Sequence, residues 1–301
     1  MGDLQSVRAD RTLSRAGLWA VGPRQLALPI EARGLSEVTI ASGMLQTSPD
    51  FDVLAWLCER WARQPTPSGV MRPTLYELGS DLYAGPPSGK DYATLRSSLW
   101  RLAWVTVQIY GIDALTGEPG DFETRGGLLD VGQSRTHGSG QDRISVELDG
   151  WLRRAIEEGA PVRIPWQTLR QFDRNHQLAK RLWIYLQAER WRQCGDGSVE
   201  GCWIAVGDHL EAALGMTYGQ HRQARAALKR ACATVRNVDA RYAAGHLAVA
   251  RVGKTWRIQA ERPTWDTWCQ LRGRTTHAPP DDAERRRIQA KLASAPFLRA
   301  V

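Results

Sequence analysis

The chain has 301 residues and carries 40 Lys and Arg against 32 Asp and Glu, a formal net charge of +8. Hydrophobic residues make up 43% of it, enough for a packed core, which excludes global disorder. The length suits one large domain or two of ordinary size. The basic surplus favours a phosphate-rich partner, but it does not separate DNA from RNA or from an acidic membrane surface.

Membrane insertion, secretion and zinc binding are not expected. No apolar run approaches the roughly 20 residues of a membrane helix, and the N-terminus lacks the apolar stretch of a secretory signal. None of the five cysteines, Cys58, Cys194, Cys202, Cys232 and Cys269, lies in a CxxC motif or beside a histidine cluster. Cys194 and Cys202 flank a glycine-rich turn and could meet across a hairpin, but free thiols in a reducing cytoplasm are the expectation.

The first half of the chain predicts a flexible tail followed by a domain. Residues 1–35 are the tail, and they include a short apolar peptide at 25–30. Residues 36–160 form the domain, in which helical spacing of apolar residues predicts helices over 51–63, 74–83 and 90–103. Residues 36–46 favour a strand or hairpin, and further strands are predicted at 105–110, 121–132 and 142–149.

The second half repeats this order without repeating the sequence. Residues 161–262 form a second domain, with helices predicted at 175–191, 208–214 and 220–238. Strands are predicted at 202–206, 246–252 and 255–260, and residues 263–301 are a basic C-terminal tail. The order of helix, short helix, turn, longer helix and strands predicts an α+β protein with two tandem winged-helix domains and flexible termini. In such domains the helix-turn-helix presents one exposed helix to the major groove, and the β-wing lies beside it.

The helix at 220–238 is the strongest candidate for DNA contact, because it carries six basic or histidine side chains and no acid before Asp239. At 100° per residue, Arg222, Arg225 and Lys229 share one face. Arginine in the first turns suits guanine edges, and the later cations suit phosphates. A solvated basic face on a core helix is the alternative. The candidate contacts here are Tyr218, Gln220, His221, Arg222, Arg225, Lys229 and Arg230.

The corresponding helix of the first domain, 90–103, is less basic. Its candidate contacts are Lys90, Tyr92, Arg96 and Arg101, for which phosphate positioning and base reading are equally open. The hairpin that follows the 220–238 helix adds Arg251 and Lys254 as backbone contacts, with solvated hairpin charges as the alternative.

Catalysis, cofactors and metals find no support in the sequence. Residues 85–91 resemble a phosphate loop only loosely, because prolines remove backbone donors and Asp91 stands where Ser or Thr should bind magnesium. The six histidines are scattered, and no paired acidic motif suits a two-metal nuclease. We therefore expect a binding protein with no catalytic residue, cofactor or metal site.

The chain resembles plasmid replication initiators of the TrfA type and, more broadly, the iteron-binding Rep proteins. The resemblance is carried by FDVLAWL (51–57), TLYELGSDL (74–82) and LRSSLWRL (95–102), by LAKRLWIYL (178–186), and by the helix segment 225–236 with its following wing. Together these stretches span roughly residues 36–262. The resemblance implies that monomers bind direct repeats (iterons) in double-stranded origin DNA, open an AT-rich region and recruit the host initiator and helicase. It also implies a possible homodimer and a bacterial cytoplasmic location on plasmid or nucleoid DNA.

The peptide at 25–30 is similar to the short motifs by which bacterial replication proteins bind the polymerase sliding clamp. Its candidate clamp-binding residues are Gln25, Leu26, Leu28, Pro29 and Ile30. A glutamine amide and spaced apolar side chains suit a small hydrophobic pocket. The alternative is a strand packed on the first domain. For the whole chain, a tandem winged-helix transcription regulator and, less favoured, a relaxase-type enzyme are the other candidates.

Overall fold

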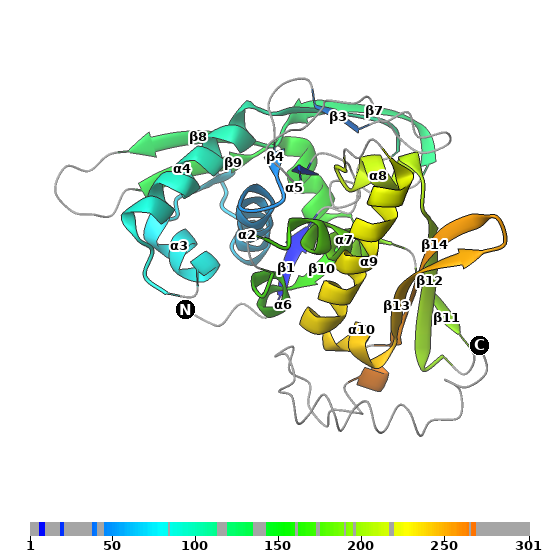
Figure 1. Cartoon of the computed structure of the whole chain (residues 1–301). Helices are drawn as coiled ribbons and strands as arrows, with labels where there is room; N and C mark the ends of the chain where they lie inside the picture. The colour runs from blue at the N-terminus through cyan, green and yellow to red at the C-terminus, as the bar shows by residue number, and fades with distance from the viewer. Residues whose placement is uncertain are drawn as a thin grey trace. The chain divides into compact units, whose positions relative to one another are not determined.

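A computed structural model describes residues 6–9, 19–20, 38–40, 45–83, 85–112, 119–134, 143–159, 162–172, 175–189, 191–194, 197–216, 220–264 and 266–268 (Figure 1). The protein is a mixed α+β structure with two compact units. The N-terminal unit comprises Val7–Ile164 and Ala212–Thr217, and the C-terminal unit comprises Met1–Ser6, Pro165–Glu211 and Tyr218–Val301. Tyr218 and residues 25–30, which the sequence analysis singled out, lie outside the described residues.

Among its described residues, the N-terminal unit contains the helices α2 (Asp50–Arg63), α3 (Leu75–Tyr83), α4 (Gly89–Trp104) and α5 (Gly150–Glu157). The first three confirm the helices predicted at 51–63, 74–83 and 90–103. Helix α4 begins at a capping box, in which Ser88 accepts a hydrogen bond from the Asp91 amide and Asp91 accepts one from the Ser88 amide. Helix α2 is buried along most of its length, including Phe51 and Trp61, so it forms the centre of this core.

In the part of the N-terminal unit that the structure describes, the strands form two three-stranded sheets and two short pairs. One sheet has the order β5 (Val70–Met71), β9 (Arg143–Leu148), β8 (Leu129–Ser134), and the other has β3 (Val38–Ile40), β6 (Thr106–Ile112), β7 (Pro119–Gly127). The single strand predicted at 121–132 is two strands. The chain turns at the fully buried Leu128, whose carbonyl accepts a hydrogen bond from the Asp149 amide, and passes there from the β3-β6-β7 sheet into the β5-β9-β8 sheet.

Two of the short strands lie within the segment predicted as a flexible tail. Strand β1 (Ser6–Ala9) pairs with β10 (Val162–Pro165), and β2 (Trp19–Ala20) pairs with β4 (Leu45–Gln46). The tail prediction is therefore wrong at these strands, because partners more than twenty residues away supply the hydrogen bonds that local sequence does not reveal.

The C-terminal unit contains α6 (Trp166–Arg170), α7 (Gln177–Ala188), most of α8 (Asp208–Ala213), α9 (His221–Val238) and α10 (Ala240–Ala244). Its sheet has the order β11 (Arg192–Cys194), β12 (Val199–Ala205), β14 (Thr255–Pro263), β13 (His246–Val252). Helix α9 packs between α7 and β13 through Ala224, Leu228 and Val235, which recur at helical spacing. Figure 1 shows α9 in yellow beside this sheet, with the β13–β14 hairpin in orange.

A buried polar network ties α7, β12, α10 and β14 together. The Glu200 carboxylate accepts hydrogen bonds from Arg262 at 2.6 Å and from Arg241 at 3.0 Å. Arg262 also donates to the Gln187 amide oxygen and to the Tyr242 hydroxyl. Burial raises the pKa of Tyr242, so its hydroxyl keeps its proton. The network holds the base of the β14 strand against the helices.

The two units share one order of elements and one strand pairing. A helix is followed by a strand (β5 or β12), then two helices, then two strands (β8 and β9, or β13 and β14). In both sheets the strand that comes last in the chain (β9 or β14) lies in the centre. It pairs on one side with the strand before the two helices (β5 or β12) and on the other side with the strand that directly precedes it (β8 or β13). The N-terminal unit adds the β6–β7 hairpin before this closing pair, and the C-terminal unit adds β11 before β12 and the short helix α10 between α9 and β13.

Cys58, Cys194, Cys202 and Cys232 are free thiols. The β11–β12 register places Cys194 opposite Val199, so Cys202 does not face it across the hairpin. Burial raises the pKa of Cys202 and of Cys232 to about 12. Within the part of the chain that is described, no helix is both long and apolar enough to cross a membrane.

Candidate nucleic-acid interface

Helix α9 presents a basic side to solvent. Its buried residues are small or apolar, whereas Gln220, His221, Arg222, Lys229 and Arg230 are exposed. The helix contains no acidic residue. Because Gln220 precedes the helix without a side-chain cap, the first-turn amides keep the positive end of the helix dipole open to an anion. These five predicted contacts therefore all lie on accessible surface.

The β13–β14 hairpin supplies a second basic element. Its tip turns at Gly253, whose φ of 60° favours glycine, and Thr255 donates a hydrogen bond to the Val252 carbonyl. The predicted contacts Arg251 and Lys254 are both exposed here. The turn thus holds two cations at the free end of the hairpin.

Trp256 joins the helix to the hairpin, and sequence analysis missed it. The Arg225 guanidinium carbon lies 5.0 Å from its ring centroid, and the Lys229 ammonium nitrogen lies 5.4 Å away. Both distances suit a cation–π contact. Arg251 is the cross-strand partner of Trp256. The indole therefore orients two cations of α9 while leaving their N–H donors available.

A second tryptophan lies on the other face of the sheet. Trp203 is 60% exposed, and the guanidinium carbon of Arg257 lies 4.0 Å from its ring centroid. Successive residues of a strand point to opposite faces, so Arg257 and Trp256 flank the sheet on its two sides. The thirteen tryptophans of the sequence offered no way to choose these two, because their positions depend on strand register.

His221, the first residue of α9, contacts Glu211 of α8. The His221 Nδ1 atom lies 3.5 Å from a carboxylate oxygen of Glu211. The histidine side chain is 67% exposed, whereas the glutamate side chain is only 10% exposed. His221, a predicted DNA contact, therefore also lies beside the nearly buried carboxylate of Glu211.

In the N-terminal unit, the exposed stripe of α4 is mainly uncharged. It runs along the helix at three- and four-residue spacing through Lys90, Ala93, Ser97, Trp100 and Trp104. Trp100 is 45% exposed and Trp104 is 74% exposed. Of the predicted contacts, Lys90 is exposed, whereas Tyr92 and Arg96 are half-buried. Helix α4 thus offers fewer cations than α9.

Arg101 forms an ion pair within the fold. Its Nε and a terminal nitrogen donate to the two oxygens of Asp50 at 2.9 and 2.7 Å. Asp50 is fully buried, and its hydrogen bonds raise the pKa of Arg101. This contact gives Arg101 a structural role that the sequence analysis did not foresee.

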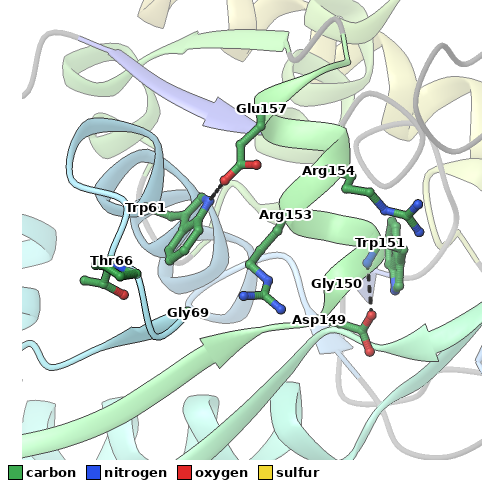
Figure 2. Close-up of a pocket in the computed structure, with 10 residues that line it drawn as sticks. Trp61, Thr66, Gly69, Asp149, Gly150, Trp151, Arg153, Arg154 and Glu157 are labelled. Carbon is green, nitrogen blue, oxygen red and sulfur yellow. Dashed lines mark hydrogen bonds between the residues drawn. The ribbon is translucent and has the colours of Figure 1, made fainter.

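The N-terminal unit also contains a pocket of about 810 Å³ between α2 and α5 (Figure 2). Two of its charged side chains are engaged locally: Glu157 accepts a hydrogen bond from the Trp61 indole N–H at 2.6 Å, and Arg153 pairs with Glu147 at 3.3 Å. Arg153 also lies over the Trp61 ring. Since these groups satisfy one another, the lining does not single out a ligand, and the C-terminal surface is the stronger candidate site.

Comparison with known proteins shows the fold but not a family. No protein-family model and no curated protein sequence matches this chain. The crystal structure of selenomethionine derivatives of domain 2 and domain 3 of RctB is similar, with a TM-score of 0.52 and 12% identity over 84% of this chain and 98% of that one. A further crystal structure of RctB domains 2-3 gives a TM-score of 0.44 and 11% identity over 85% and 98%. The mixed α+β architecture is therefore shared with two successive domains of another protein.

Proposed function

We propose that this protein is a replication initiator that binds double-stranded origin DNA with two winged-helix domains. The shared order of elements and the strand pairings β5-β9-β8 and β12-β14-β13 support a winged-helix assignment for each unit. In this assignment α4 and α9 are the recognition helices, and β8–β9 and β13–β14 are the wings.

The observation that carries DNA binding is the basic surface of α9 and its hairpin. Arg222, Lys229 and Lys254 are exposed, and Arg225 is oriented by Trp256. An N-terminal arginine in the major groove can read guanine, while the hairpin cations contact phosphates. In the N-terminal unit, Lys90 positions the DNA backbone, because the rest of the exposed α4 stripe carries no charge.

The initiator role rests on two supports: the sequence resemblance to TrfA-type, iteron-binding proteins, and the fold likeness to domains 2 and 3 of RctB. On this proposal the chain binds direct repeats, opens an adjacent AT-rich region and recruits the host initiator and helicase in the bacterial cytoplasm. The 25–30 peptide binds the sliding clamp, and a homodimer is a second functional state. The protein acts by binding alone and has no catalytic residue.

The test begins by selecting duplexes from a random pool and measuring affinity by fluorescence anisotropy. Arg222→Ala should weaken binding to the selected duplex by about 1–3 kcal/mol and relax one base position, as loss of a base contact does. Arg192→Ala is the matched control, because it removes an exposed arginine from β11, at the sheet edge opposite β13. Equal losses in both variants would refute base reading by α9.

Initiation is tested separately from DNA binding. A plasmid that carries the selected sites as direct repeats, beside an AT-rich segment, should replicate only when the chain is supplied. If the chain binds these repeats and controls a promoter but never supports replication, the transcription-regulator assignment replaces the initiator.

A further inference from the structure

Three potential metal ligands meet at the turn between α8 and α9. A ligand atom from each of Asp208, Glu211 and His221 lies within 4.8 Å of the other two. Among the described residues, this is the one group of three or more His, Cys, Asp or Glu side chains with that spacing. The sequence analysis did not connect these residues, because His221 is ten residues from Glu211 and belongs to a different helix.

Asp208 and Glu211 approach the cluster from one side. They are three residues apart in α8, a spacing that puts side chains on the same face of a helix. His221 opens α9 and faces them with Nδ1, 3.5 Å from the Glu211 oxygen. Two rigid elements thus present two carboxylates and an imidazole to one point.

The burial of Glu211 is a second, independent indication that this cluster binds a cation. The residue is only 7% exposed, and among the described residues its side chain has one hydrogen bond or ion pair, the long one to His221. A buried carboxylate is costly unless it is paired and hydrogen-bonded or coordinates a metal. A single imidazole contact at 3.5 Å gives little compensation, and a bound divalent cation would give much more.

We propose that Asp208, Glu211 and His221 bind a divalent transition-metal ion such as Zn²⁺ or Mn²⁺. Carboxylate oxygen and imidazole nitrogen bind Zn²⁺ at about 2.0–2.2 Å, which places neighbouring ligand atoms about 3–4 Å apart. The 3.5 Å between His221 Nδ1 and the Glu211 carboxylate oxygen already lies in this range. Rotation of the exposed Asp208 side chain completes the triad, and water fills the remaining positions. The imidazole disfavours Mg²⁺ and Ca²⁺, which prefer oxygen ligands.

The metal would strengthen DNA binding, a consequence that rests on the proposed function. The two carboxylates lie beside the first turn of α9, where they repel phosphate. A divalent ion cancels their formal charge of −2 and links α8 to the start of the recognition helix. Metal availability would then regulate the affinity of the C-terminal unit for DNA.

Metal binding is measured first, without DNA. The full chain, stripped with a chelator and carrying Cys194→Ser and Cys269→Ser to remove competing thiols, is titrated with Co²⁺ by visible absorption and with Zn²⁺ by calorimetry. One equivalent should bind, and His221→Ala and Asp208→Asn should each weaken binding by at least about tenfold. Both side chains are exposed, so these variants should fold. His246→Ala, which removes an exposed histidine on β13, should bind as the parent does.

Two results would overturn the site. One is the absence of bound Co²⁺ and Zn²⁺ in the parent. The other is unchanged affinity in both the His221→Ala and Asp208→Asn variants, which would leave Glu211 and His221 as a simple ion pair.

The DNA arm compares anisotropy titrations with Zn²⁺ and with chelator, using the duplex selected above. Zn²⁺ should tighten binding severalfold in the parent and have no effect in Asp208→Asn. Metal binding with no change in DNA affinity would refute the regulation but not the site. If the chain binds no duplex at all, the proposed function fails while the Co²⁺ titration still decides the metal site.

Discussion

Replacing Trp256 with alanine should weaken duplex binding while leaving the charge of the interface unchanged. The ring lies 5.0 Å from the Arg225 guanidinium carbon and 5.4 Å from the Lys229 nitrogen. Without it, both side chains keep their charge but lose the surface that holds them in place. The variant therefore tests how much the orientation of the two cations contributes to DNA affinity while the number of charges stays the same.

The magnitude follows from the two contacts. A partly exposed cation–π contact contributes about 0.5–1 kcal/mol, so two contacts give at most about 1–2 kcal/mol. Since about 1.4 kcal/mol corresponds to a tenfold change in affinity, the dissociation constant should rise at most about 5- to 30-fold. Trp256→Phe retains an aromatic face and should recover part of this loss.

The assay is an anisotropy titration, with urea unfolding of each variant to ensure that all are folded. A double-mutant cycle between Trp256→Ala and Lys229→Met isolates the contact, and a coupling of about 0.5–1 kcal/mol is expected. If the two losses are simply additive, or if Trp256→Ala binds DNA as the wild type does, the ring does not orient Lys229 for DNA.

Four further predictions concern stability, thiol chemistry and the N-terminal peptide. Arg101→Ala leaves the fully buried Asp50 without its bidentate partner and should cost about 3–5 kcal/mol of unfolding free energy; a urea midpoint equal to that of the wild type would contradict this. Gly245→Ala should destabilise the C-terminal unit by about 1–3 kcal/mol, because its Cβ would lie 2.0 Å from the Glu261 carbonyl oxygen, and an unchanged melting temperature would argue against the clash. Burial raises the pKa of Cys202 and Cys232 to about 12 from a usual value of 9. Because the unfolded chain loses these thiol protons at lower pH than the folded chain does, the contribution of the two thiols to the free energy of unfolding should be complete below pH 9 and fall as the pH rises toward 12. This fall should be smaller in Cys202→Ala. Combined Gln25→Ala and Leu28→Ala should abolish capture of the chain by immobilised sliding clamp without changing DNA affinity, and undiminished capture would exclude the peptide.

The helices with strong periodicity were predictable from the sequence alone. Apolar residues in α2, α4 and α9 recur at the spacing of a helix, so these elements and their buried faces follow from local pattern. The charge of α9 was equally visible, because its cations lie within one continuous segment. The mixed α+β class follows from the same local signals.

Elements and contacts that depend on residues far apart in the chain could not be predicted from the sequence. Strands β1 and β2 form against distant partners, and α10 begins where Asp239 accepts hydrogen bonds from the Arg241 amide and from the Trp183 indole, 56 residues away in sequence. The Arg101 partner lies 51 residues away, so the sequence placed that side chain toward solvent.

The candidate site divides in the same way. Its cations were identified by sequence, because net charge and helical spacing are local properties. The positions of Trp256 and of the Asp208–Glu211–His221 cluster were decided only by the tertiary structure. Strand register places Trp256 against α9, and the cluster joins side chains of two helices, α8 and α9, whose spacing in the chain carries no signal.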